Sequence, residues 1–284
     1  MLRLAQFVLR GPMYAIGTSV VTMALPFLFW LAAAVVALVF LRLGPRQGLN
    51  IGLWTALPAA AWLFLGQDPA PLTVLLISMV LAGVLHATIS WQNALLAGAV
   101  AAAVLGQLSP LLAPAFLEQV VEMGTQVYQE MDPEVAQELG EDAETAVRTM
   151  MIGSLAAINF VIAMLSCLLA RGWQARLFNP GGLQREFHDF RLTGPVSLVM
   201  VLLMAFGPYI GLNPGVALLV FGIPLVLGGI ALVHGVVARR AMSKGWLVAL
   251  YVALVLLGPT LLFVLVFVAI LDSWLNIRQR IAPV

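Results

Sequence analysis

The chain has 284 residues, of which 62% are hydrophobic and 10% charged, and its mean hydropathy is +1.03. Soluble domains contain about 25% charged residues, so this composition excludes an ordinary water-soluble enzyme. The 14 Lys and Arg residues nearly balance the 13 Asp and Glu residues, and the net charge of +1 gives no reason to expect nucleic-acid binding. The single cysteine, Cys167, excludes an intramolecular disulfide and is interpreted as a small apolar residue.

Six stretches contain no Asp, Glu, Lys or Arg, and their lengths predict the membrane spans. They are residues 11–41, 47–67, 69–117, 149–170, 192–238 and 245–271. A helix needs about 20 apolar residues to cross the hydrocarbon core, so the runs at 69–117 and 192–238 each predict two spans. Pro26 divides the first run into short spans near 8–24 and 27–42.

Turn-forming residues predict the remaining breaks. Polar residues at 90–93 and the Gly- and Pro-rich segment 207–214 divide the two longest runs. Gly258-Pro259 stands at the centre of the last run, which is either one long kinked helix or a hairpin of two short spans. The predicted fold class is therefore all-α, a polytopic transmembrane bundle of nine or ten spans, some of them short.

The distribution of charge predicts the orientation in the membrane. Every basic loop falls on one side of the predicted spans and the acidic segment 118–144 on the other, as the positive-inside rule requires. We therefore expect a bacterial inner-membrane protein with a cytoplasmic N-terminus that is not a removable signal peptide. Arg278 and Arg280 follow the last run and favour the hairpin, which also places the C-terminus in the cytoplasm.

This pattern predicts three regions. They are an N-terminal bundle of about five spans over 1–114, an acidic extracytoplasmic segment over 115–147 and a C-terminal bundle over 148–284. Apolar residues spaced by three and four predict an amphipathic helix over 115–131 at the outer interface, and Asp132-Pro133 predicts the start of a second short helix. The acids lack the spacing of a cation-binding loop, so a solvated acidic face is preferred to a metal site.

The predicted cytoplasmic segment 171–195 combines four arginines with four aromatic residues. Its Asn-Pro-Gly-Gly sequence at 179–182 predicts a tight turn, and an apolar stripe at helical spacing follows. One interpretation is an interfacial helix whose arginines contact anionic lipid headgroups. The other is a docking surface for a cytoplasmic protein. The residues that we select for such a contact are Arg185, Glu186, Phe187 and Arg191.

The sequence contains none of the common motifs of membrane enzymes, such as H-E-x-x-H, G-x-S-x-G, a P-loop or C-x-x-C. We therefore predict no catalytic residues, no cofactor and no metal. Polar groups inside spans are functional candidates by default, and the candidates here are His86, Asn159, His234 and Asp272. For the histidines, a helix-end side chain satisfied by water or a carbonyl is the preferred interpretation. Asp272 is expected to face Asn276 rather than Arg278, or to pair with an arginine of another inner loop.

Small residues form two seams at which helices could approach closely. Ala94, Gly98, Ala102 and Gly106 recur every fourth residue. The second seam runs from Gly222 to Gly229 around Pro224, and it predicts an interrupted, closely packed helix.

Three stretches together resemble a known family over nearly the whole chain. They are residues 41–48 (Leu-Arg-Leu-Gly-Pro-Arg-Gln-Gly), Phe178-Asn179-Pro180-Gly181-Gly182 with Glu186-Phe187 and Arg191-Leu192, and Leu271-Asp272-Ser273-Trp274 with Arg278. They resemble the YybS-like family of predicted bacterial membrane proteins. That family is similar to the substrate-binding subunits of energy-coupling-factor transporters and, more distantly, to the rod-shape protein MreD. The resemblance implies a bundle of short helices that holds a small molecule or lipid and depends on partners for energy.

Three functions follow as hypotheses. The first is a non-enzymatic inner-membrane protein of transporter-like architecture that binds a small or lipidic ligand within a complex. The alternative is a membrane scaffold that recruits cytoplasmic or envelope partners, with a protein bound at 171–195. The third is an intramembrane enzyme. Beyond the lipid bilayer, the expected partners are therefore a small-molecule or lipid ligand and a protein, and not a nucleic acid.

Overall fold

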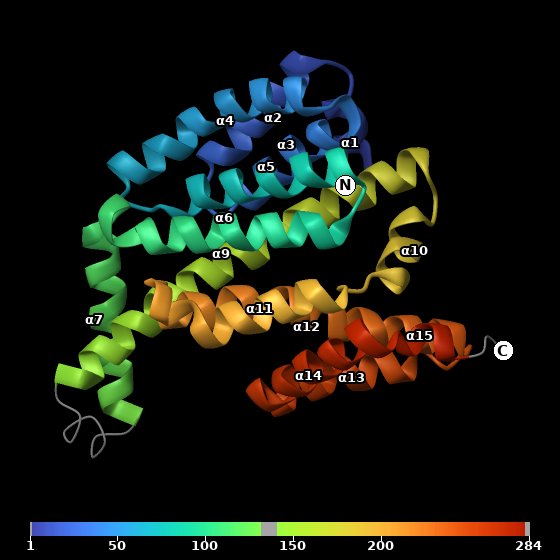
Figure 1. The fold of residues 1–284 in the computed structure, drawn as a ribbon. Helices are drawn as coiled ribbons and strands as arrows, with labels where there is room; N and C mark the ends of the chain where they lie inside the picture. The colour runs from blue at the N-terminus through green and yellow to red at the C-terminus, as the bar shows by residue number, and fades with distance from the viewer. Residues whose placement is uncertain (1, 132–140, 282–284) are drawn as a thin grey trace.

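The computed structural model describes residues 2–131 and 141–281, and within them every element is a helix (Figure 1). The predicted all-α class is therefore confirmed. The first six helices are α1 (Leu2–Val8), α2 (Pro12–Ala24), α3 (Phe29–Leu43), α4 (Pro45–Leu65), α5 (Ala70–Thr88) and α6 (Trp91–Leu112). They are followed by α7 (Pro114–Met131), α9 (Glu141–Phe178), α10 (Gly182–Asp189), α11 (Gly194–Phe206) and the 3-10 helix η1 (Gly207–Ile210). The last are α12 (Pro214–Arg239), α13 (Gly245–Leu257), α14 (Pro259–Leu275) and α15 (Ile277–Arg280).

The breaks between helices fall where the sequence predicts them. Phe27, with a φ of 61°, separates α2 from α3 just after Pro26. Ser90 caps α6 by accepting a hydrogen bond from the amide of Asn93 at 3.3 Å. Asn213 caps α12 in the same way through the amide of Val216 at 3.1 Å. Local turn chemistry thus sets where α6 and α12 begin.

A helix occupies each predicted span, but among the described residues only five helices are long and apolar enough to cross a membrane alone: α4, α5, α6, α9 and α12. The apolar helices α3, α13 and α14 have 15, 13 and 17 residues, and α10 forms a bent pair with α11 and η1 at 70°. Helices this short cross a bilayer only by thinning it or with the help of neighbours. The nine or ten predicted spans therefore include helices that are too short to cross the hydrocarbon core of a bilayer unaided.

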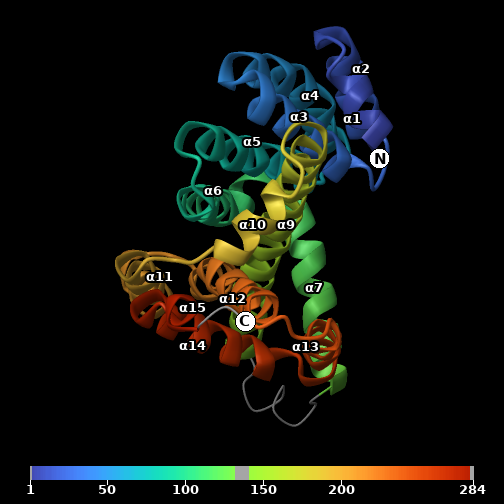
Figure 2. The ribbon, with the colours of Figure 1, turned by 90° about the vertical axis from the view of Figure 1, so that its right-hand side faces the viewer.

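Helix α9 connects the two halves of the molecule. It contains 38 residues, which at 1.5 Å per residue makes it about 57 Å long. It extends beyond the predicted span at 149–170 in both directions. In Figure 2, α9 passes between helices α1–α6 and helices α11–α15, and it packs against α3, α5, α6, α7 and α12.

Helix α7 confirms the helix predicted over 115–131. It runs across the ends of the long helices rather than alongside them (Figure 1). Leu117 and Val121 pack inward, whereas Met123 and Val127 remain exposed, and Glu118 pairs with Arg148 of α9 at 2.6 Å. This orientation agrees with a helix lying at a membrane interface. The helix predicted to begin at Asp132-Pro133 lies outside the described residues.

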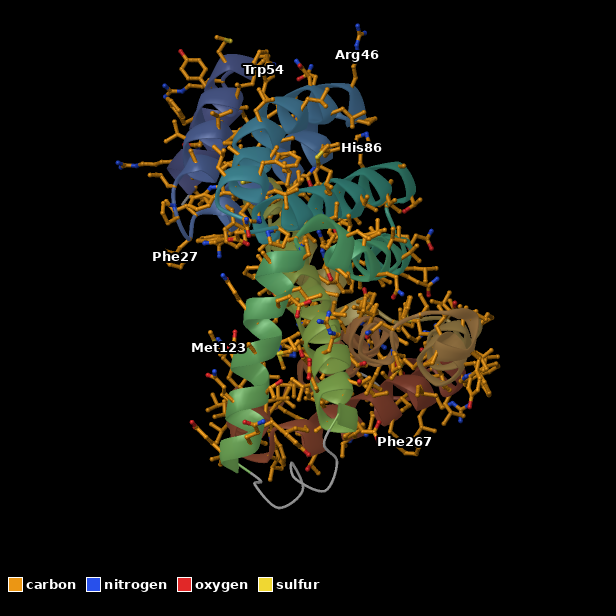
Figure 3. All side chains as sticks on the ribbon, turned by 90° about the vertical axis from the view of Figure 1, so that its left-hand side faces the viewer. Phe27, Arg46, Trp54, His86, Met123 and Phe267 are labelled. Atoms are coloured by element: carbon orange, nitrogen blue, oxygen red, sulfur yellow. The ribbon has the colours of Figure 1, made fainter. Side chains whose placement is uncertain are left out.

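Large apolar side chains cover the outer surface of the molecule. Phe27, Trp54, Met123 and Phe267 are 85%, 51%, 65% and 61% exposed and point outward in Figure 3. Helix α13 has no buried residue at all. Soluble monomers rarely expose contiguous apolar surface on this scale. Together with the five spanning helices, this surface defines a multi-pass membrane protein.

The first small-residue seam faces other helices, as predicted. A Cβ atom on Gly98 would lie 2.5 Å from Leu81 of α5 and 2.9 Å from Phe160 of α9. In the second seam, Gly229 lies against the backbone of Leu265 in α14. The prediction of an interrupted helix there is wrong, because α12 continues from Pro214 to Arg239 with Pro224 inside it. Close packing on α14 therefore does not require a break in α12.

We predict that Gly98→Leu lowers stability in detergent by about 3 kcal/mol, because the added side chain must displace two buried neighbours. The matched change is Val100→Leu, since Val100 lies on the same helix and is 47% exposed. Thermal unfolding of both variants in one detergent measures the difference. Equal tolerance of the two changes would contradict close packing at Gly98.

The run at 245–271 forms a hairpin rather than one kinked helix. The chain reverses at Gly258, whose φ of 48° and ψ of −124° suit glycine, and α14 returns alongside α12. The side chain of Arg278 consequently reaches the carbonyl oxygen of His188. Helices α15 and α10 therefore lie toward the same end of the molecule, on the right of Figure 1.

We predict that topology reporters fused after Val284 and inserted in the 240–244 loop report the same side of the membrane. Paired alkaline phosphatase and green fluorescent protein fusions measure this. Opposite results at the two sites would contradict the hairpin. A cytoplasmic result at both would also support the orientation predicted from the basic loops.

Candidate functional site

Helix α10 folds back along the end of α9 because of the turn that joins them. Gly181 has a φ of 81°, which an L side chain rarely adopts, and the Gly182 amide donates to the carbonyl oxygen of Asn179 at 2.9 Å. A Cβ atom on Gly182 would come within 2.5 Å of the Asn179 side chain. The Asn-Pro-Gly-Gly sequence thus forms the predicted tight turn and places α10 against α9.

Glu186 ties α10 to two other helices. Its Oε2 atom accepts hydrogen bonds from the Trp91 indole of α6 and from Nε of Arg171 in α9, each at 3.1 Å. Arg171 also forms an ion pair with Oε1. The side chains of Arg171 and Glu186 are only 12% and 33% exposed. Glu186, selected as a contact for a partner, is therefore occupied within the protein.

Phe187 and His234, two of the predicted residues, lie together. Their rings meet edge to face with centroids 5.3 Å apart. His234 Nδ1 lies 3.0 Å from the carbonyl oxygen of Ile230, so Nδ1 carries the proton in this contact. Nε2 then accepts a hydrogen bond from the hydroxyl of Tyr251 at 3.3 Å. His234 is thus satisfied by a carbonyl and a neighbouring helix, in agreement with the preferred interpretation.

Asp272 pairs with Arg278, which corrects the sequence interpretation. Oδ2 of Asp272 lies 3.4 Å from Nε of Arg278, and the two side chains are 2% and 3% exposed. The expected geometry assumed one continuous helix, but α14 ends at Leu275 and Asn276 adopts a left-handed φ of 47°. The chain then folds back, and the Ile277 amide donates to Oδ1 of Asp272 at 2.9 Å.

Residues near the end of α10 extend this pair into a network. Arg278 donates to the carbonyl oxygen of His188 at 2.7 Å, and Arg191 donates to the carbonyl oxygen of Asp272 at 3.4 Å. Arg239 donates to the carbonyl oxygen of Arg278 at 2.5 Å and pairs with Asp189 at 3.3 Å. We call Asp189, Arg191, Arg239, Asp272 and Arg278 the Asp272–Arg278 network. It fixes the end of α10 to α12, α14 and α15.

Burial lowers the pKa of His188 below its usual value, and the neighbouring His234 and Arg278 lower it further against an opposing effect of Asp189. Burial likewise lowers the pKa of Arg278, while Asp272 opposes this shift. A histidine with a lowered pKa is neutral at pH 7. As far as His188 is concerned, the free energy of unfolding is therefore highest above about pH 6.5 and decreases as the pH falls toward the pKa of His188 in the folded protein.

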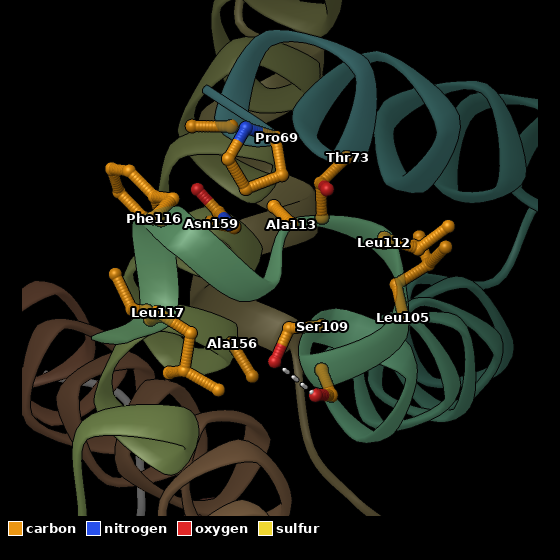
Figure 4. Close-up of a pocket in the computed structure, with 13 residues that line it drawn as sticks. Pro69, Thr73, Leu105, Ser109, Leu112, Ala113, Phe116, Leu117, Ala156 and Asn159 are labelled. Atoms are coloured by element: carbon orange, nitrogen blue, oxygen red, sulfur yellow. Dashed lines mark hydrogen bonds between the residues drawn. The ribbon is translucent and has the colours of Figure 1, made fainter. Parts of the chain in front are cut away.

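The remaining predicted residues lie apart from the network. Arg185 is exposed, and its guanidinium lies 3.4 Å from Oδ1 of Asn179. His86 is exposed at the end of α5 (Figure 3). Asn159 is buried in a cavity of about 40 Å³ between α5, α6, α7 and α9, near Pro69 and Phe116 (Figure 4). That volume is enough for very few water molecules.

We predict that Arg185→Lys is nearly silent, because a lysine keeps the charge of an exposed side chain. Arg191→Lys is expected to lower stability by about 1 kcal/mol, because it loses the hydrogen bond to the Asp272 carbonyl oxygen. Thermal unfolding and growth of a strain carrying each variant measure these effects. A loss of function with Arg185→Lys would instead favour a partner that needs the planar guanidinium.

A larger cavity lies between α9 and α10, and we call it the α9–α10 cleft. Its volume is about 700 Å³. The residues that line it are Leu168, Leu169, Gly172, Trp173, Ala175, Arg176, Gly181, Leu183, Gln184 and Phe187. Only Phe187 was among the predicted contacts. Gly172, Trp173, Ala175 and Arg176 were not selected because nothing in the pattern shows that α9 continues past residue 170.

The α9–α10 cleft changes from apolar to polar along its length. Leu168 and Leu169 line one end, and Arg176 lies about 12 Å farther along the helix axis. Gln184 and the start of α10 lie at the polar end. Trp173 is buried between the two ends, and its indole N–H has no hydrogen-bond partner among the described residues. Such a buried unpaired donor is uncommon and calls for an explanation.

The fold and this cleft define the class of protein as an all-α, multi-pass membrane protein with an amphipathic cleft at one end of the bundle. Comparison with family models, curated proteins and solved structures finds no match to this chain. Within residues 2–131 and 141–281, no three His, Cys, Asp or Glu side chains form a group that could hold a metal ion.

Proposed function

We propose that this protein is a non-enzymatic component of the bacterial inner membrane that binds an amphiphilic, lipid-like ligand in the α9–α10 cleft. The single observation that carries this proposal is the cleft itself. Its volume of about 700 Å³ lies in the range of ligand sites, about 300–1,000 Å³. Transporter-like architecture, a cytoplasmic N-terminus and membership of the YybS-like family belong to this proposal and rest on the sequence.

The position of the cleft supports a ligand that enters from the membrane. Leu168 and Leu169 belong to the apolar section of α9, whereas Arg176 lies beyond it. The apolar end therefore lies at the depth of lipid chains and the polar end at the depth of headgroups. A soluble ligand would have no need of this gradient.

The alternative is a scaffold that recruits a protein to segment 171–195. Within the described residues, Glu186 contacts Arg171 and Trp91, and Arg191 contacts the Asp272 carbonyl oxygen. Two of the four selected residues are thus engaged inside the molecule, and Phe187 lines the cleft. This leaves Arg185 alone as an exposed contact, so ligand binding is the better supported function.

Blocking the cleft tests the proposal. Gly172 lines the cleft, and a Cβ atom there would lie 3.5 Å from Leu183, an ordinary contact. Gly172→Leu should therefore fold and fill the space. The control is Gly17→Leu, because a Cβ atom on Gly17 has nothing within 4 Å.

The measurement is native mass spectrometry of protein purified in a mild detergent, with thermal unfolding to confirm folding. We expect a bound amphiphile in the wild type and in Gly17→Leu, and its loss in Gly172→Leu. An empty wild-type protein, or equal retention by Gly172→Leu, would contradict ligand binding in the cleft. A retained protein without any small molecule would support the scaffold instead.

A further inference from the structure

We propose that the ligand of the α9–α10 cleft is an anionic phospholipid whose phosphate binds at Arg176. This inference rests on the proposed function and adds the charge of the ligand. It places the lipid chain along Leu168 and Leu169 and the headgroup at the polar end of the cleft. The argument combines the charge of that end, an unpaired donor and the apolar wall.

Positive charge at the polar end is uncompensated. Arg176 lines the cleft, is exposed and forms no ion pair among the described residues. Glu186, the nearby carboxylate on α10, is already neutralised by Arg171. An arginine held at a polar rim binds a phosphate through two parallel N–H donors, which gives both charge and geometry.

The backbone of α10 adds a second favourable element. Gly181, Leu183 and Gln184 line the cleft at the beginning of this helix. Amides at a helix N-terminus lack intrahelical partners and carry partial positive charge, so they favour an anion. Because α10 has only eight residues, this contribution supplements Arg176 and does not replace it.

The indole of Trp173 is the independent observation that points to a ligand. The side chain is 2% exposed and lines the cleft, yet its N–H has no partner among the described residues. A buried donor left unpaired costs free energy that an acceptor would recover. The indole N–H is not accessible from the cleft in this structure, so a phosphate or ester oxygen of a lipid would become its acceptor once the surrounding side chains move.

The apolar wall favours a lipid over a soluble phosphate compound. Leu168, Leu169 and Phe187 occupy the part of the cleft away from Arg176. Acyl chains bury such a surface, whereas a free phosphate would leave it empty. Charge and apolar surface on one cleft thus match the two ends of an anionic phospholipid.

The test measures binding of two phospholipids that share their acyl chains and phosphate but differ in headgroup, one being anionic and the other zwitterionic. Dioleoylphosphatidylglycerol and dioleoylphosphatidylcholine are titrated into the delipidated full-length protein in detergent, and bound lipid is counted by native mass spectrometry. We expect the anionic lipid to bind about tenfold more tightly, as for one charge-assisted phosphate contact. Arg176→Gln should largely remove that preference by weakening binding of the anionic lipid most, because the choline cation already offsets the phosphate charge in the zwitterionic lipid.

Two further variants separate a specific contact from general charge. Arg240→Gln removes an exposed arginine from the loop after α12 and should keep the full preference. Trp173→Phe keeps the aromatic ring, removes the donor and should weaken binding of both lipids about fivefold, because the N–H can serve a phosphate or an ester oxygen. Thermal unfolding of each variant confirms that it is folded.

The outcomes distinguish this inference from the proposed function. Equal binding of the two lipids by the wild type, or an unchanged preference in Arg176→Gln, would overturn the anionic headgroup while leaving a lipid cleft. Displacement of the lipid by inorganic phosphate alone would indicate a site for soluble phosphate and also overturn it. Failure of both lipids to bind would contradict the proposed function itself.

Discussion

Gly153→Ala is expected to destabilise the protein by about 3 kcal/mol or more, which exceeds the usual cost of overpacking because the obstacle is backbone. A Cβ atom on Gly153 of α9 would overlap the backbone of Gly215 in α12, including its carbonyl oxygen at 2.6 Å. A side chain can rotate away from such a clash, but a helix backbone cannot. The two helices must separate, and the packing between α9 and α12 is weakened along its length.

Thermal unfolding in detergent measures this loss. Gly222→Ala is the matched control, because it lies on α12 and its Cβ atom would meet only Met204 at 3.8 Å. The control should lose almost nothing in contacts, and alanine is also the better helix former. If Gly153→Ala were as stable as Gly222→Ala, the close approach of α9 and α12 would be wrong.

Asp272→Ala is expected to cost about 3–5 kcal/mol, because it leaves the buried charge of Arg278 without its partner. Arg278 is 2% exposed and cannot reach water without moving α15. The change also removes the acceptor for the Ile277 amide. Asp272→Asn should cost less, since an amide oxygen can still accept that hydrogen bond.

A double variant tests whether the charge is the cause. Asp272→Asn combined with Arg278→Met removes both charges and should be more stable than Asp272→Asn alone. Chemical unfolding in detergent provides the comparison. Losses that simply add in the double variant would mean that the two residues act independently, which would contradict the buried pair.

The positions of the helices and turns could be predicted because their causes are local. Long charge-free runs must leave water, and their lengths predict where helices form. The turn at 179–182 follows from residues that favour a left-handed backbone, and Ser90 and Asn213 supply caps for the helices that follow them. The packing face at Gly98 could also be predicted from local sequence, because small residues at every fourth position form one face of any helix.

The candidate site could be predicted only in part. Phe187 and His234 were both selected, but their contact joins α10 to α12 and is set by packing. Asp272 and Arg278 meet because Asn276 reverses the chain, and a helical wheel cannot include such a reversal. The prediction that α12 is interrupted at Pro224 was wrong, because neighbouring helices keep α12 continuous.

The sequence by itself determined the all-α membrane class and most of the helix breaks, because each depends on composition or on a few adjacent residues. Only the tertiary structure decided which polar groups are paired and where a ligand could bind. The cleft exists because α9 continues past its apolar section to Phe178 and α10 folds back over it. Arg176 and Trp173 line a cleft only because these two helices overlap. Contacts between distant segments depend on tertiary packing, which a local sequence pattern does not predict.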